Sequence, residues 1–209
     1  VDASNISHSD LDIIMEENNK FLLIVISGPS GVGKQTIAKE LINLMPEIEP
    51  SISATTRPMR NGEKDGVDYY FLSQDDFERK IKEGYFIEHA QVHGNLYGTP
   101  IDNIKRIQDK GGKLLLVIDV NGGKNVKKAY PKNTILFFIK PPTFYDLKER
   151  LHKRGSESAE EINKRLNTAF IELSNQFWYD YIVVNDDPKK AATEIMNHIL
   201  KGEKNEKLQ

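Results

Sequence analysis

Cysteine is absent from the 209-residue chain, and the longest apolar runs are far too short to cross a bilayer. Disulfide bonds, thiol catalysis and thiolate metal sites are therefore excluded. The first twenty residues also lack the basic region and the long apolar segment of a secretion signal. We therefore expect a cytoplasmic protein with no membrane partner, in which residues 1–20 form a flexible extension and residues 202–209 a charged tail.

An excess of positive charge is also lacking, because 29 Lys and Arg residues face 31 Asp and Glu residues, for a net charge of -2. A nucleic acid duplex would meet no broad basic field, so nucleic acid binding is disfavoured. The hydrophobic share of 38% is enough for the interior of one domain with inserts. The composition leaves both a monomer and a homo-oligomer open.

Arginine is scarce, with seven in the chain, and five of the seven fall within residues 57–60 and 150–165. A guanidinium group presents a planar fork that matches two phosphate oxygens at once. The clustering therefore indicates at least two places built for phosphate. For residues 150–165 the alternative is a solvated helix face, with ion pairs such as Glu161 with Arg165.

The apolar pattern predicts an α/β fold built on a doubly wound parallel sheet. Continuous runs of branched and aromatic residues, each followed by a helical stretch, are typical of parallel strands that are buried on both faces. Ligands of such sheets bind at the carboxyl ends of the strands. The runs are residues 21–26, 113–119, 134–139 and 180–184.

Residues 51–98 follow a different pattern, which predicts a small mixed α+β insert. Three short strand-like runs occur there with one helix among them, at residues 51–56, 67–72 and 86–92. Four helix starts are predicted along the chain, from two capping boxes and from two capping oxygens that precede a proline. They are Ser73 with Asp76, Ser158 with Glu161, Thr99 before Pro100, and Asp187 before Pro188.

A glycine-rich loop that ends in a lysine follows the first predicted strand, and a helical repeat follows the loop. Glycine permits positive φ and close backbone approach, so main-chain N–H groups can surround a phosphate chain while Lys34 reaches its β- and γ-phosphates. This order predicts a P-loop that binds ATP; the alternative is a glycine-rich turn without a ligand. The predicted ATP contacts of this segment are Gly28, Pro29, Ser30, Gly31, Val32, Gly33, Lys34, Gln35 and Thr36.

One residue of this loop departs from the usual pattern. Gln35 stands where a Ser or Thr that contacts Mg²⁺ is usual, and a hydroxyl follows one place later at Thr36. We expect the cofactor Mg²⁺ to be held mainly by ATP and water, with Thr36 and Asp119 as the candidates for a contact from the protein.

Several ordered motifs, together with the glycine-rich loop, resemble the guanylate kinase family from about Phe21 to Met196. The resemblance implies a P-loop kinase core, a GMP-binding insert and a helical lid. The motifs are residues 53–63, 66–71, 94–99, 118–122, 150–155, 163–166 and 184–187, with Glu88 and the pair Pro141–Pro142.

The resemblance implies an acceptor site in the insert. Arginines and tyrosines would hold the monophosphate of GMP, since guanidinium forks and phenol donors suit a dianion. The carboxylate of Glu88 would accept two N–H groups of guanine, whereas adenine would place a lone pair against it. For the arginines and tyrosines the alternative is surface pairing. For the hydroxyls of Ser53 and Thr99 it is a structural role. The implied GMP contacts are Ser53, Arg57, Arg60, Glu63, Tyr69, Glu88, Tyr97, Thr99 and Asp119.

The resemblance also implies residues that act on the donor. Asp119 would organise the acceptor and metal-bound water, or would simply cap a helix. The lid arginines Arg154 and Arg165 would face the transferring phosphoryl group, with Arg150 nearby. Asn185 would lie near the adenine of ATP, unless it only forms a turn. The implied catalytic residues are Lys34, Arg57, Asp119, Arg154 and Arg165.

The expected reaction is transfer of the γ-phosphoryl group of MgATP to GMP or dGMP, giving ADP and GDP in purine nucleotide metabolism. Residues 21–50 and 99–201 would form the core, with the lid at about 142–170 and the GMP-binding insert at 51–98. The alternatives are an inactive guanylate-kinase-like module that binds a phosphorylated protein, and a kinase for another nucleoside monophosphate. An intact loop lysine disfavours the first and Glu88 disfavours the second.

Overall fold

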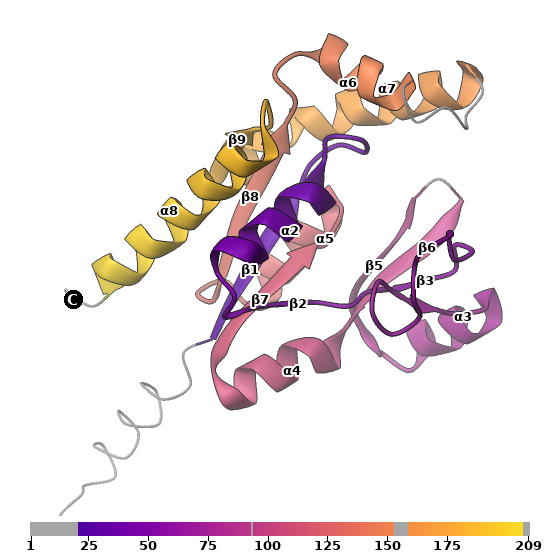
Figure 1. Ribbon diagram of the computed structural model, residues 1–209. Coiled ribbons are helices and arrows are strands. Elements are labelled where there is room, and N and C mark those ends of the chain that lie inside the picture. Colours follow the sequence, from indigo (N-terminus) through magenta and orange to yellow (C-terminus); the bar gives the residue numbers. More distant parts are fainter. Residues whose placement is uncertain (1–20, 93, 153–158, 207–209) are drawn as a thin grey trace, which may run out of the picture.

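A computed structural model describes residues 21–92, 94–152 and 159–206. Its core is a five-stranded parallel sheet in the order β2-β7-β1-β8-β9 (Figure 1). The central strand β1 lies between β7 and β8, so the loop that follows it begins in the middle of the sheet. The strands are β1 (Phe21–Ser27), β2 (Ile48–Pro50), β7 (Gly112–Val117), β8 (Thr134–Lys140) and β9 (Tyr181–Val184).

Helices cover both faces of this sheet, as a doubly wound fold requires. Alternate residues of β1 point to opposite faces: Ile24 and Ile26 pack in one apolar cluster with α2 and α8, and Leu23 and Val25 pack in another with α4 and α5. All four of these side chains are fully buried. The helices are α2 (Lys34–Leu44), α4 (Ile101–Lys110), α5 (Val120–Ala129) and α8 (Pro188–Glu206).

The insert is a second sheet of mixed direction, in the order β4-β3-β6-β5, with one helix packed on it. Phe77 of the helix is fully buried and stacks on Phe86 with ring centroids 4.5 Å apart. Figure 1 shows this unit beside the core rather than within it. Its elements are β3 (Ala54–Thr55), β4 (Tyr70–Phe71), α3 (Gln74–Lys82), β5 (Phe86–Val92) and β6 (Asn95–Pro100).

Two further helices, α6 (Phe144–His152) and α7 (Ala159–Ser174), lie between β8 and β9 in the chain, and a short 3₁₀ turn, η1 (Gln176–Trp178), follows them. They pack on the core through Leu147, Leu151 and Ile162. These helices cover most of residues 142–170, the range predicted for the lid. Arg154 and the predicted cap at Ser158 lie outside the described residues.

The fold class is confirmed, and several local predictions need correction. The strands β2 and β6 were not predicted as strands, and the run 67–72 forms a strand only at Tyr70–Phe71, with an isolated bridge at Tyr69. Short strands such as these are defined by their partners in the sheet, which local sequence does not reveal. The last helix also continues to Glu206, so the expected tail from residue 202 is helical up to that point.

Two of the predicted helix starts hold and one does not. Ser73 Oγ accepts the main-chain N–H of Asp76, and Asp187 Oδ1 accepts those of Lys189 and Lys190. Thr99, in contrast, caps no helix: α4 begins at Ile101, and the hydroxyl of Thr99 donates to Glu88 instead. Thr99 belongs to β6, and its pairing with β5 places it opposite Glu88.

Candidate active site

The loop between β1 and α2 has the backbone of a phosphate cradle. Gly28, Gly31 and Gly33 have φ of 137°, 86° and 100°, values that side chains rarely allow. At Gly28 a Cβ would stand 2.2 Å from the carbonyl oxygen of Ile139. Lys34 opens α2, and its Nζ donates to the carbonyl oxygens of Gly28 (2.5 Å) and Pro29 (3.1 Å). The ammonium group thus lies against the loop whose N–H groups begin the helix, where an anion is favoured.

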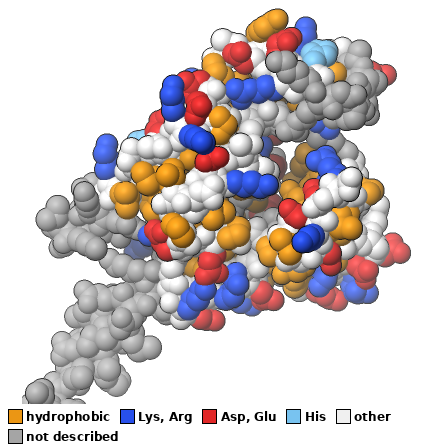
Figure 2. Space-filling view, viewed as in Figure 1, with side chains coloured by type: hydrophobic (Ala, Val, Ile, Leu, Met, Phe, Trp, Pro, Cys, Tyr) orange, Lys and Arg blue, Asp and Glu red, His pale blue; other side chains and the backbone are white. Residues whose placement is uncertain are grey.

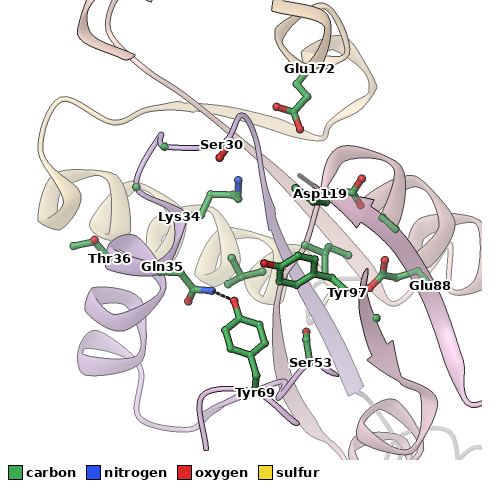
Figure 3. A pocket seen from close by; sticks show the side chains of 17 residues that line it. Ser30, Lys34, Gln35, Thr36, Ser53, Tyr69, Glu88, Tyr97, Asp119 and Glu172 are labelled. Atoms are coloured by element: carbon green, nitrogen blue, oxygen red, sulfur yellow. Dashed lines mark hydrogen bonds between the residues drawn. The ribbon is translucent and has the colours of Figure 1, made fainter. Parts of the chain in front are cut away.

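This loop and the insert face one another across a single pocket of about 270 Å³, drawn in Figure 3. In the space-filling view the molecule is hollowed between the insert and the core, with charged side chains near the opening (Figure 2). The pocket therefore brings together the predicted donor and acceptor sites. It is lined by Ser30, Gly31, Gly33, Lys34, Gln35, Thr36, Ser53, Tyr69, Glu88, Ala90, Val92, Tyr97, Gly98, Val117, Ile118, Asp119 and Glu172.

Glu88 is the most buried carboxylate of this pocket, with 6% of its surface exposed. It lies on β5, and its Oε1 accepts the hydroxyl of Thr99, on the paired strand β6, at 2.6 Å. Burial, helped by the nearby charge of Asp119 and opposed by the hydrogen bonds of Thr99, raises the pKa of Glu88 to about 7. Gly122 leaves room for this carboxylate, because a Cβ there would lie 2.7 Å from Oε2.

Asp119 caps a helix, which is one of the two roles that the sequence left open, and it also faces the pocket. It stands just beyond β7 and caps α5, where its Oδ1 accepts the N–H of Gly122 at 2.8 Å. It also lines the pocket beside Lys34. Its second carboxylate oxygen, together with the hydroxyl of Thr36, is the kind of hard oxygen donor that suits Mg²⁺. Among the described residues no group of three or more His, Asp or Glu side chains forms a ready-made metal site.

Glu63 holds the two arginines that are predicted to bind the phosphate of GMP. The guanidinium of Arg57 donates to both carboxylate oxygens of Glu63, at 2.8 and 3.0 Å, and Glu63 also accepts the main-chain N–H of Arg60. The hydrogen bond with Arg57 lowers the pKa of Glu63, and the same pairing raises the pKa of Arg57. These three residues are outside the pocket lining, whereas Tyr69 and Tyr97 line it.

Two tyrosines connect this arginine to the pocket. The guanidinium of Arg57 lies 5.5 Å from the ring centroid of Tyr69, within cation–π range. The rings of Tyr69 and Tyr97 meet edge to face at 6.1 Å. Arg57 therefore contacts the tyrosine pair that lines the pocket, although it does not line the pocket itself.

Arg150 and Asn185 support the loop from behind. Arg150 donates to the carbonyl oxygens of Val32 (3.2 Å) and Asn185 (2.8 Å), and the amide of Asn185 donates to Val32 at 2.6 Å. Asn185 is 2% exposed and lies against Gly33, where a Cβ would stand 2.5 Å from its Nδ2. Both side chains thus hold the shape of the phosphate loop, and neither lines the pocket.

Glu172 is a pocket residue that the sequence reasoning missed. Its side chain points from α7 toward Ser30 and Lys34 (Figure 3), and its Oε2 is buried without a hydrogen-bond partner. Burial raises the pKa of Glu172, while the positive charge of Lys34 lowers it. A signal existed in the sequence, because Glu172 follows Arg165 by about two helical turns and so shares its helix face. Arg165 itself lies on α7 outside the pocket lining.

Over the described part of the chain, no helix is both long and apolar enough to span a membrane.

Comparison with known proteins identifies the family of this chain. Residues 20–202 match the sequence model of the guanylate kinase family. Guanylate kinase from Clostridioides difficile is 45% identical over 186 residues, which cover 89% of this chain and 90% of the relative. Guanylate kinase from Chlorobaculum tepidum is 46% identical over 177 residues, which cover 85% of this chain and 91% of the relative. The crystal structure of guanylate kinase from Anaplasma phagocytophilum superposes with a TM-score of 0.73 at 37% identity, covering 88% of this chain and 87% of that one. The chain therefore belongs to the guanylate kinase family.

Proposed function

We propose that this protein is a guanylate kinase, an ATP:GMP phosphotransferase that converts ATP and GMP to ADP and GDP. The observation that carries the proposal is the shared pocket: Lys34 of the phosphate loop and Glu88 of the insert line the same cavity. A donor held at the loop and an acceptor held at the insert would meet there. The relatives that match the chain over most of its length carry the same name.

The chemistry asked of the protein is mostly positioning and charge neutralisation. The loop N–H groups and Lys34 would hold the β- and γ-phosphates of ATP. Mg²⁺, with Thr36 and Asp119 as its protein contacts, would neutralise phosphate charge. The acceptor is a phosphate oxygen that is already an anion, so no side chain has to remove a proton from it.

Acceptor selection would rest on the buried side of the pocket. Once ionised, Glu88 can accept the two adjacent N–H donors of guanine, while Thr99 holds its Oε1 in place. The phenols of Tyr69 and Tyr97, with Arg57 and Arg60 behind them, would hold the monophosphate. The same contacts would accept dGMP, because none of them depends on a ribose hydroxyl.

The lid arginines would complete the site on closure. Arg165 of α7, with Arg154, would supply positive charge to the transferring phosphoryl group, and closure would exclude water that could otherwise hydrolyse ATP. Arg150 and Asn185 would act by keeping the loop in shape. We place the protein in the cytoplasm, in purine nucleotide metabolism.

The test is an assay of ADP release with ATP, Mg²⁺ and a panel of acceptors. We expect turnover with GMP and dGMP, and little turnover with AMP, UMP or dTMP. Phosphorylation of another monophosphate in preference to GMP would make the protein a kinase of different specificity. If a folded protein shows no turnover with any acceptor, the proposed kinase activity is refuted and a binding module is favoured.

A further inference from the structure

Gln35 reaches from the phosphate-loop side of the pocket to the acceptor side. It is the second residue of α2, and its exposed side chain extends across to the insert. Its Nε2 donates to the phenol oxygen of Tyr69 at 3.4 Å, the contact drawn as a dashed line in Figure 3. Both residues line the pocket. The side chain that follows the P-loop lysine therefore points toward the predicted GMP site and away from the loop that would hold ATP.

The direction of this hydrogen bond matters for what Tyr69 can do. A phenol has one O–H donor and two lone pairs, and Gln35 occupies a lone pair. The O–H of Tyr69 is therefore left to donate to an anion in the pocket. Burial raises the pKa of Tyr69, so it keeps this proton at neutral pH. The ring is held on its other sides by Arg57 and by the edge contact with Tyr97.

We propose that Gln35 is a positioning residue for the acceptor phosphate: it orients the hydroxyl of Tyr69 and thereby couples the helix of the donor loop to the GMP site. This inference rests on the proposed function, because it takes the pocket beside Tyr69 as the place of the GMP monophosphate. The main-chain N–H of Gln35 remains in the first turn of α2, where it can still serve the donor. The position usually contacts Mg²⁺ through a hydroxyl, so the amide would give it a different task here.

Side-chain length and donor capacity can be separated by substitution. Gln35→Met keeps the length and removes the N–H donor, whereas Gln35→Ser removes the length and restores the usual hydroxyl. Loss of one hydrogen bond should weaken GMP binding about three- to tenfold in either variant. ADP binding should stay within about twofold of the wild type. Gln108→Met, on the exposed face of α4, is the matched control and should change neither affinity.

A double-mutant cycle tests whether the effect passes through the phenol. Tyr69→Phe removes the hydroxyl, after which Gln35 has nothing left to orient. Gln35→Met should then add less than about twofold to the loss caused by Tyr69→Phe alone. Independent, multiplicative losses in the double variant would overturn the proposal.

Calorimetric binding of GMP, guanosine and ADP, measured without turnover, completes the experiment. Guanosine lacks the phosphate, so its affinity should be the same in Gln35→Met and wild type. An equal loss for guanosine and GMP, an equal loss for ADP, or unchanged GMP affinity would each overturn the proposal. Because no step requires phosphoryl transfer, a protein that binds GMP without phosphorylating it would refute the proposed function and still decide the role of Gln35.

Discussion

The carboxylate of Glu63 accepts two hydrogen bonds from the guanidinium of Arg57, of 2.8 and 3.0 Å. The side chain of Glu63 is 19% exposed and that of Arg57 is 10% exposed. This pairing holds the fork of Arg57 over the ring of Tyr69. An arginine that is ordered in advance loses less side-chain entropy when a phosphate arrives. The acidic residue that accepts hydrogen bonds from both predicted phosphate-binding arginines thus has a positioning role.

Glu63→Gln should therefore weaken GMP binding, although it removes a negative charge from the acceptor side. The amide keeps one acceptor oxygen but loses a charge-assisted bond worth about 1.5 to 3 kcal/mol, so we expect a roughly tenfold rise in the GMP dissociation constant. Calorimetry measures the GMP dissociation constant, and Glu78→Gln on the exposed face of α3 is the control. Unchanged or tighter GMP binding would mean that Arg57 needs no partner.

Lys34→Ala should lower turnover by about two powers of ten or more, because it removes a cation from the place where the reaction spreads negative charge. GMP affinity should change little, since the predicted GMP contacts other than Asp119 lie on the insert and none lies on the phosphate loop. The measurement is steady-state ADP release together with calorimetric GMP binding. Lys39→Ala, on the exposed face of the same helix, should retain wild-type rates; near-normal turnover in Lys34→Ala would contradict the assignment.

Glu88 should make the stability of the protein depend on pH. Its pKa is raised from about 4.5 to about 7 by burial, so between these values the folded protein holds a proton that the unfolded chain has released. The free energy of unfolding therefore falls as pH rises through this window, by up to about 3 kcal/mol. Glu88→Gln is neutral at every pH and its Oε1 can still accept from Thr99.

Denaturation of wild type and Glu88→Gln from pH 5 to pH 8 measures this effect. The stability of the variant relative to wild type should increase toward pH 8, and the exposed Glu78→Gln should follow wild type throughout. A difference between wild type and Glu88→Gln that stays constant over this range would show that the carboxylate does not change its proton there.

Gly33→Ala should damage the phosphate loop more than its backbone strain alone would. The added Cβ would meet the Nδ2 of Asn185 at 2.5 Å and push on the amide that holds Val32. Gly84→Ala is the matched control, because Gly84 also has a positive φ, of 68°, but open space around it. We expect at least tenfold weaker ADP binding for Gly33→Ala and unchanged binding for Gly84→Ala; equal effects of the two substitutions would rule out the steric contact as the cause.

Several features of the site could be read from the chain because they are local. The strand, glycine loop and helix from Phe21 onward, and the cap of α8 at Asp187, each depend on residues a few places apart. The resemblance of ordered motifs added Glu88, Tyr69 and Tyr97, and the structure brings them into the pocket with Lys34.

Other features were decided only when distant segments met. Local spacing made Thr99 a helix cap, but pairing of β5 with β6 places it opposite Glu88, whose buried carboxylate takes its hydroxyl. Arg150 and Asn185, which were predicted to contact ATP, reach Val32 across gaps of 118 and 153 residues, a support for the loop that local sequence does not reveal.

The sequence by itself determined where a phosphate chain can be held, because that cradle is made by the backbone of one short segment. Only the tertiary structure decided which side chains share the pocket, as Glu172 and the contact of Gln35 with Tyr69 show. The physical reason is that burial, pKa and hydrogen-bond partners depend on groups brought together by sheet pairing and helix packing, and no local pattern specifies them.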